Sequence, residues 1–194
     1  QWFNKIWPNL LALLLFIVIC FIYFSPVVQG KKLIQGDVMN AGSVQQEIMD
    51  YRKDGKGPLW TNSMFGGMPS YQIWTQYPAN IASHVIDIWN KVFPNPINFV
   101  LQYLFGGFFL FRMLRFKPWL SFLGAIAIGF ASYNFIIIEA GHTGKALAIA
   151  FFAPILGAVI MAFRGKRLAG ASLLALFLAL EIRSNHLQMT YYLM

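Results

Sequence analysis

The feature that most constrains this chain is a series of apolar runs long enough to cross a lipid bilayer. A membrane-spanning helix needs about 20 predominantly apolar residues, and several runs approach or reach that length. Only 11% of the 194 residues are charged, against about a quarter in an average soluble domain. The runs are continuous and do not alternate with polar residues, as membrane β-strands would. The sequence therefore predicts an all-α, polytopic bundle of transmembrane helices.

The predicted spans cover about 6–24, 97–115, 118–138, 146–163 and 168–182. The turns at 112–117 and 164–167 contain basic residues and no acidic ones. Positive charge in short loops marks the cytoplasmic side of a membrane protein. We therefore expect the loop at 25–95, the turn at 139–145 and the segment at 181–186 to lie outside the cytoplasm.

The long loop between the first two spans is predicted to contain two amphipathic helices that lie at the membrane interface. The first covers about 43–53, because Ser43 and Gln46 form a capping-box pattern at its start. The second covers about 78–93 and carries a helically spaced apolar stripe. The stripe consists of Ile81, Val85, Ile88, Trp89 and Val92.

Asp37 is the first candidate functional residue, because it follows closely after the first span. Ionisable groups at the edge of the hydrocarbon region are often functional. A carboxylate in this place can act as a general base or bind a cation. The alternative interpretation is a solvated loop residue or a helix cap.

The turn at 139–145 contains Glu139, His142 and Lys145 at intervals of three residues. If one helix continues through the turn, these side chains share a face. Gly141 and Gly144 instead indicate a broken helix, whose free N–H groups and Lys145 would form an anion site. The alternative is an ordinary turn with a Glu–Lys pair.

A third polar cluster follows the last predicted span and contains Glu181, Arg183, Asn185 and His186. An arginine that reaches from a span end to the headgroups would explain Arg183 alone. It does not explain why Asn185 and His186 lie beside it, so we interpret the cluster as a binding site.

Several motifs resemble the YfhO-like integral membrane proteins of bacteria, in particular those of the Bacteroidetes type. The matching motifs are 24–27 (FSPV), 35–37 (QGD), 58–69 (PLWTNSMFGGMP), 140–145 (AGHTGK), 148–150 (AIA) and 181–192 (EIRSNHLQMTYY). Proteins of that family are much longer, so the resemblance implies that these residues are an N-terminal part, which we expect to be inactive alone.

The resemblance also implies a glycosyltransferase of the GT-C class. Such enzymes have many membrane helices and two interfacial helices in the first extracytoplasmic loop, and they take sugars from a polyprenyl-phosphate donor. Asp37 would then be the catalytic base that activates an acceptor hydroxyl. The residues expected to bind substrate or its phosphate are His142, Lys145, Arg183, His186, Glu139, Glu181 and Asn185.

The expected partners are a polyprenyl-phosphate sugar lipid and the membrane lipids of the bacterial inner membrane. The net charge of +8 does not indicate nucleic acid, because the basic residues cluster at span ends. Many GT-C enzymes have two adjacent acids where this chain has Gly36-Asp37-Val38. No metal site is therefore predicted, although a divalent metal is possible if Glu139 supplies a second carboxylate.

Two other functions fit the same polar residues. A lipid or polysaccharide transporter or flippase would place polar groups near the middle of the membrane. A non-catalytic scaffold of an envelope complex would leave Asp37, His142 and Arg183 far apart in space.

Overall fold

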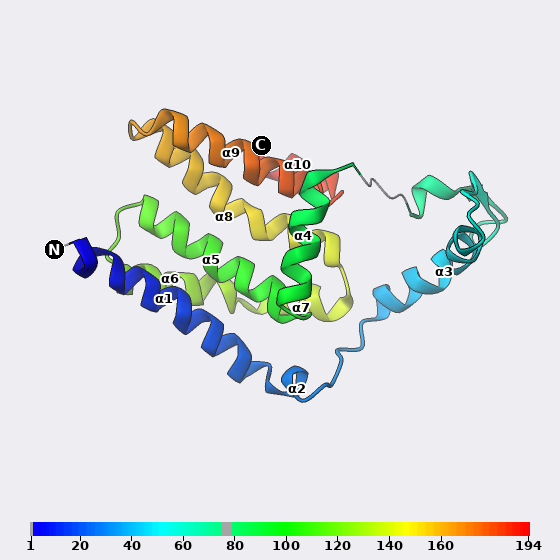
Figure 1. The fold of residues 1–194 in the computed structure, drawn as a ribbon, viewed down its shortest axis with the longest axis horizontal. Helices are drawn as coiled ribbons and strands as arrows, with labels where there is room; N and C mark the ends of the chain where they lie inside the picture. Colours follow the sequence, from blue (N-terminus) through cyan, green and yellow to red (C-terminus); the bar gives the residue numbers. More distant parts are fainter. Residues whose placement is uncertain (1, 75–78) are drawn as a thin grey trace.

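The computed structural model describes residues 2–74 and 79–194, and most of this part of the chain is helical. The all-α prediction is confirmed. The bundle consists of α1 (Trp2–Tyr23), α5 (Ile97–Met113), α6 (Pro118–Gly129), α7 (Ser132–Ala140), α8 (Thr143–Phe163) and α9 (Arg167–Ile182) (Figure 1). The remaining elements are α2 (Ser25–Val28), α3 (Gly36–Lys53), β1 (Trp60–Thr61), β2 (Met68–Pro69), the 3-10 helix η1 (Ser70–Gln72), α4 (Ile81–Val92) and α10 (Leu187–Leu193).

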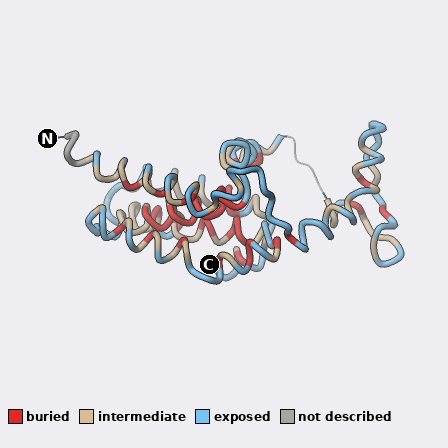
Figure 2. Tube along the Cα trace, turned by 90° about the horizontal axis from the view of Figure 1, so that it is seen from below, coloured by how far each residue is buried: buried red, intermediate tan, exposed pale blue. Residues whose placement is uncertain are grey.

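The core of the bundle lies around α5, which packs against α1, α6 and α8. Small residues allow these close approaches. A Cβ atom added at Gly106 would lie 2.7 Å from the Pro154 ring on α8, and one at Gly107 would lie 3.3 Å from the Ala125 backbone on α6. Figure 2 shows buried residues concentrated inside the bundle and few of them in α3.

Two helices are long and apolar enough to cross a membrane, namely α1 over Ile6–Tyr23 and α8 over Thr143–Phe163. Helices α6 and α7 together form a third candidate if a pair bent by 43° counts as one span. The predicted continuous span at 118–138 is thus interrupted. Asn134 stabilises the interruption, because its side-chain amide donates to the Ile128 carbonyl at 2.7 Å and so satisfies the end of α6.

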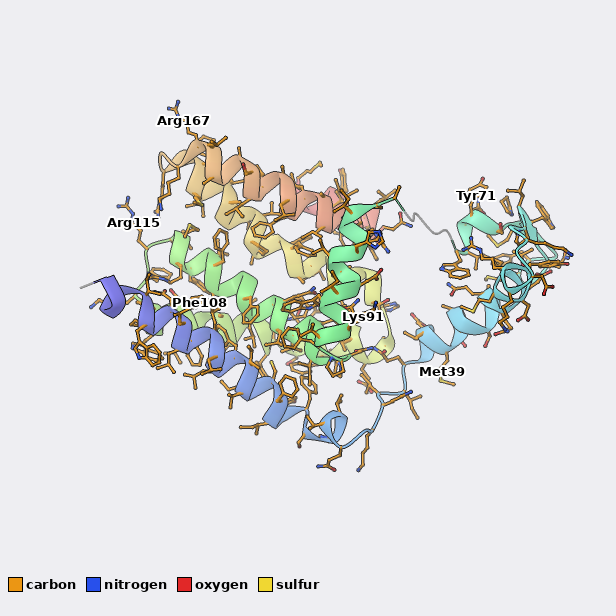
Figure 3. The ribbon with its side chains drawn as sticks, viewed as in Figure 1. Met39, Tyr71, Lys91, Phe108, Arg115 and Arg167 are labelled. Atoms are coloured by element: carbon orange, nitrogen blue, oxygen red, sulfur yellow. The ribbon has the colours of Figure 1, made fainter. Side chains whose placement is uncertain are left out.

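The two basic turns lie side by side at one end of the bundle. The Arg164 guanidinium donates to the Met113 carbonyl, which joins the turn after α8 to the turn after α5. Arg115 and Arg167 both project from this end in Figure 3. We call it the basic end, made of 112–117 and 164–167, and we call the opposite end, made of 35–37, 139–145 and 181–188, the polar end.

Helix α4 runs across the bundle helices near the polar end (Figure 1). Pro78, where the predicted helix begins, lies outside the described residues, and the observed helix starts at Ile81 with the Asn80 side chain accepting from the Ala82 N–H at 3.0 Å. Trp89 turns inward and donates to the Asn98 carbonyl at 3.1 Å. The other four members of the predicted stripe are exposed, which leaves an apolar surface available to lipid.

Helix α3 differs from the prediction, because it begins at Gly36 and not near Ser43. Ser43 lies inside the helix, where its hydroxyl donates to the Met39 carbonyl at 3.1 Å and cannot cap the start. Ile48 is its buried residue. Helix α3 and the β1–β2 ribbon extend away from the bundle and do not lie across its polar end (Figure 1).

Candidate functional site

Asp37 and His142 lie within hydrogen-bond distance of each other at the polar end. Asp37 lies in the first turn of α3, and His142 is the N-cap residue of α8. The Asp37 Oδ2 and His142 Nδ1 atoms are 2.8 Å apart, and the side chains are 51% and 52% exposed. The pair is therefore open to a substrate, and its geometry fixes Nδ1 as the imidazole nitrogen that donates to the carboxylate.

Gln35 holds the segment that carries Asp37 against the bundle. This side chain is 4% exposed, although glutamine is usually found at the surface. Its amide nitrogen donates to the Ile138 carbonyl at the end of α7, and its amide oxygen accepts from Asn95 at 2.8 Å. Both ends of the buried amide are thus satisfied by segments that are distant in the sequence.

Gly141 allows this close approach. Its φ of +91° is left-handed, which ends α7 and turns the chain into α8. A Cβ atom here would lie 3.1 Å from the Cβ atom of Gln35 and 3.3 Å from that of Asp37. The residue does two tasks at once, since it breaks the helix and makes room for the 35–37 segment.

This break shows that no single helix continues through the 139–145 turn. Glu139 belongs to α7 and Lys145 to α8, so Glu139, His142 and Lys145 do not share one helical face, and the break that Gly141 and Gly144 indicated is present. The Lys145 ammonium lies 5.3 Å from the centre of the Tyr133 ring, a cation–π contact. Glu139 lines a cavity whose lining does not include His142 or Lys145.

The buried carboxylate of Glu181 forms a second cluster beside the start of α8. Glu181 is 0% exposed and accepts the Thr190 hydroxyl at 3.0 Å and 3.1 Å on its two oxygens. Nδ1 of His186 and the hydroxyl of Ser184 are buried and lack a hydrogen-bond partner among the described residues. Such atoms are uncommon in folded proteins and often indicate a functional place.

Arg183 and Asn185 face a different part of the polar end. The Arg183 Nε atom donates to the Ser83 hydroxyl on α4. Both residues line a cavity of about 320 Å³ together with Tyr71 and Trp74. Arg183 is thereby drawn toward α4 and makes no contact with the Asp37–His142 pair.

The sequence-predicted site residues thus fall into neighbouring groups at one end of the molecule, and the structure does not gather them in one pocket. Asp37 and His142 are in contact. A Cβ atom at Gly144 would lie 3.1 Å from the Ser184 carbonyl, so the first turn of α8 lies between this pair and the Glu181 cluster.

Sequence reasoning missed Gln35, Asn95, Lys31 and Lys32 as contributors to the polar end. The first two form the buried amide contact, and the lysines line the cavity beside Glu139. The signal for Gln35 was its place within the QGD motif, while nothing local in the sequence indicates that Asn95 meets it. Within 2–74 and 79–194, no three His, Cys, Asp or Glu side chains group as a metal site.

Comparison of this chain with protein-family models, with curated proteins and with solved structures finds no match. A functional proposal therefore depends on the geometry of the polar end and on the sequence motifs. The contact that joins Asp37 to His142 is the most specific of the observations at that end.

Proposed function

We propose that this chain belongs to a membrane glycosyltransferase of the YfhO-like, GT-C type, which takes a sugar from a polyprenyl-phosphate donor. The observation that carries the proposal is the Asp37–His142 pair, a solvent-accessible carboxylate held by an imidazole at 2.8 Å. The motif resemblance supplies the reaction class, and the pair supplies groups that can perform its proton transfer.

In the proposed reaction, the oxygen of an acceptor hydroxyl attacks the anomeric carbon of the donor sugar. The bond from that carbon to the phosphate oxygen breaks, and polyprenyl phosphate leaves. Asp37 takes the hydroxyl proton as the new glycosidic bond forms. His142 positions the Asp37 carboxylate through Nδ1, which limits the orientations that the carboxylate can adopt.

The leaving phosphate needs cationic groups or N–H donors, because negative charge develops on it in the transition state. Lys145 is the first candidate, since it lies one turn after His142 on α8. A helix start also leaves backbone N–H groups without an intrahelical partner, although the Thr143 N–H donates to the Gly141 carbonyl at 2.7 Å. Arg183 and His186 are further candidates, and they would have to approach from the neighbouring groups on substrate binding.

The proposed location is the bacterial inner membrane, with the polar end facing away from the cytoplasm. The basic end contains the Arg- and Lys-rich turns at 112–117 and 164–167, and positive charge in short loops favours the cytoplasmic side. The exposed apolar stripe of α4 suits the interface at the other side.

A lipid transporter or flippase is the second candidate function. The Gln102 side-chain oxygen is buried without a partner among the described residues, and Gln102 lines an apolar cavity of about 320 Å³ between α4, α5, α8 and α9. A polar group in such a place is what a path through the membrane would need. The scaffold alternative would leave Asp37, His142 and Arg183 apart; Asp37 and His142 are in contact, whereas Arg183 is bonded to Ser83 on α4.

The test compares sugar transfer by Asp37→Asn with transfer by the unchanged protein. Membrane vesicles containing the full-length protein are given a radiolabelled polyprenyl-phosphate sugar, and incorporation into acceptor is counted. Loss of a general base lowers the rate by about 10²–10⁴-fold. Asp87→Asn is the matched control, since Asp87 is an exposed acid on α4 and should leave transfer unchanged.

Equal transfer by Asp37→Asn and the unchanged protein would remove Asp37 from the mechanism. Movement of the labelled lipid between leaflets without any sugar transfer would favour the transporter.

A further inference from the structure

A cavity of about 460 Å³ at the polar end is lined by α2, by the ends of α1 and α7, and by the segment that follows α2. Its lining combines an apolar floor with charged side chains at the rim. The floor includes Phe24, Val27 and Phe135, and the charged residues are Lys31, Lys32 and Glu139. The lining does not include Asp37 or His142, so the cavity is distinct from that pair.

The position of the cavity is set by α1. The apolar stretch of this helix ends at Tyr23, where a span of that length reaches the membrane surface. The Tyr23 ring lies 5.7 Å and the Phe24 ring 6.3 Å from the Phe135 ring of α7, which forms an aromatic wall. Aromatic and lysine side chains are typical of headgroup depth in a bilayer. The cavity is thus placed where lipid headgroups lie.

The segment that carries the lysines is held at both ends. The Lys31 N–H donates to the Pro26 carbonyl at 3.0 Å, across a turn in which Gly30 has a φ of +86°. At the other end, the buried Gln35 side chain is bonded to Asn95 and to the Ile138 carbonyl. Lys31 and Lys32 are therefore kept beside the cavity.

The charges at the rim are mixed, with two ammonium groups and one carboxylate. Among the described residues no ion pair joins either lysine to Glu139, so these groups are available to a ligand. Two lysines suit a phosphate diester, which they bind as point charges. A carboxylate beside them would repel a purely anionic ligand and would instead accept hydrogen bonds from an ammonium group.

We propose that this cavity binds the headgroup of a phosphoethanolamine lipid. The phosphate lies between Lys31 and Lys32, the primary ammonium donates to Glu139, and the start of the acyl chains packs on the aromatic wall. A phosphoglycerol headgroup offers Glu139 only neutral hydroxyl donors, which bind a carboxylate more weakly than an ammonium group does. A phosphocholine headgroup has no N–H to donate. The proposal goes beyond sugar transfer and does not depend on it.

The test is native mass spectrometry of the full-length protein in detergent. The protein is titrated with phosphatidylethanolamine, phosphatidylglycerol and phosphatidylcholine of identical acyl chains. We expect phosphatidylethanolamine to bind roughly fivefold more tightly than either of the others, because one partly solvated hydrogen bond between charged groups changes a dissociation constant by about that factor. Glu139→Gln should reduce its affinity to that of phosphatidylcholine. The double variant Lys31→Gln with Lys32→Gln should weaken all three lipids.

Matched controls are Asp87→Asn for the carboxylate and Lys56→Gln with Lys91→Gln for the charge change, since these residues are exposed and outside the cavity lining. Both should bind as the unchanged protein does. The proposal is overturned if phosphatidylglycerol binds as tightly as phosphatidylethanolamine, or if Glu139→Gln keeps the preference. Glu139 is exposed, so its variant is expected to fold, and a melting curve checks this.

Discussion

The backbone conformation of one residue, Gly141, determines whether the Asp37 segment can reach α8. An L-residue at a left-handed φ is strained by about 1–2 kcal/mol. A Cβ atom at this position would also press on Gln35 and the Val38 N–H, each at 3.1 Å. The two effects can be separated, because Gly165 has nearly the same φ of +93° and no neighbouring atoms within 4 Å.

We therefore expect Gly141→Ala to lower the free energy of unfolding by about 2–3 kcal/mol and Gly165→Ala by about 1 kcal/mol. The midpoint of thermal unfolding in detergent measures both. Sugar transfer should fall in Gly141→Ala and persist in Gly165→Ala. Equal melting points for the two variants would show that the 35–37 segment does not press on Gly141.

Glu47 is the residue that ties the projecting α3 to the β1–β2 ribbon. Its carboxylate accepts hydrogen bonds from the Thr61 hydroxyl, the Asn62 N–H at 2.8 Å and the Ser63 hydroxyl at 3.0 Å. These bonds, that of Thr61 foremost, lower the pKa of Glu47. A lowered pKa in the folded state means that the ionised carboxylate stabilises the fold.

This stabilisation should be fully present above the pKa of Glu47 in the unfolded chain, about 4.3. It should be lost as the pH falls through the lower pKa that Glu47 has in the folded state. Hydrogen exchange of residues 58–70, corrected for the intrinsic effect of pH, should speed up over that acid range. Glu47→Gln should exchange faster at neutral pH and lack the acid step. If the exchange rate of residues 58–70 still rises at acid pH in Glu47→Gln, another group is responsible for the rise. Asp54→Asn is the control and should behave as the unchanged protein does.

The chemical character of the candidate site could be predicted from single residues, but most of its contacts could not. Asp37 and His142 were singled out because ionisable groups at the edge of the hydrocarbon region are often functional, and the structure pairs them. Their contact joins segments far apart in the chain, which no local pattern encodes. Arg183 was expected in the same pocket. It instead donates a hydrogen bond to the Ser83 hydroxyl on α4, a contact that the sequence does not reveal.

For the helices, hydropathy predicted where they lie but not where they are interrupted. Helices α1 and α8 occupy long apolar runs. The break between α6 and α7 is stabilised by a side-chain hydrogen bond from Asn134, which an average over many residues does not detect. The start of α3 was missed because the Ser43–Gln46 pattern also fits the interior of a helix.

The packing of α5 against α8 depends on Gly106, in the way that small residues let membrane helices approach closely. A Cβ atom there would lie 2.7 Å from the Pro154 ring and 3.1 Å from the Ala150 carbonyl. We expect Gly106→Ala to destabilise the protein by about 1–3 kcal/mol, the usual effect of overpacking. Thermal unfolding in detergent is the measurement.

Gly42→Ala is the matched control for this packing, because Gly42 lies inside α3 with no atom within 4 Å. Alanine is the better helix former there by about 1 kcal/mol, so this variant should melt at the same temperature or higher. A Gly106→Ala protein that melts like Gly42→Ala would contradict the close packing of α5 and α8.

The whole molecule has two chemically distinct ends. The basic turns meet at one end, and the Asp37–His142 pair lies at the other, from which α3 and the ribbon project (Figures 1 and 3). The charge pattern predicted this separation from the sequence. The direction in which α3 projects was not predictable, because the few residues of 31–35 that link it to the bundle have no regular secondary structure.

The most direct test of the account is the side of the membrane on which His142 lies. Cys20 is the single cysteine of the chain, so Cys20→Ser provides a background for His142→Cys or Arg115→Cys. A membrane-impermeant maleimide added to intact spheroplasts should label position 142 at once and position 115 only after lysis. Labelling of position 115 from outside, with position 142 protected until lysis, would contradict the proposed orientation and with it the extracytoplasmic site.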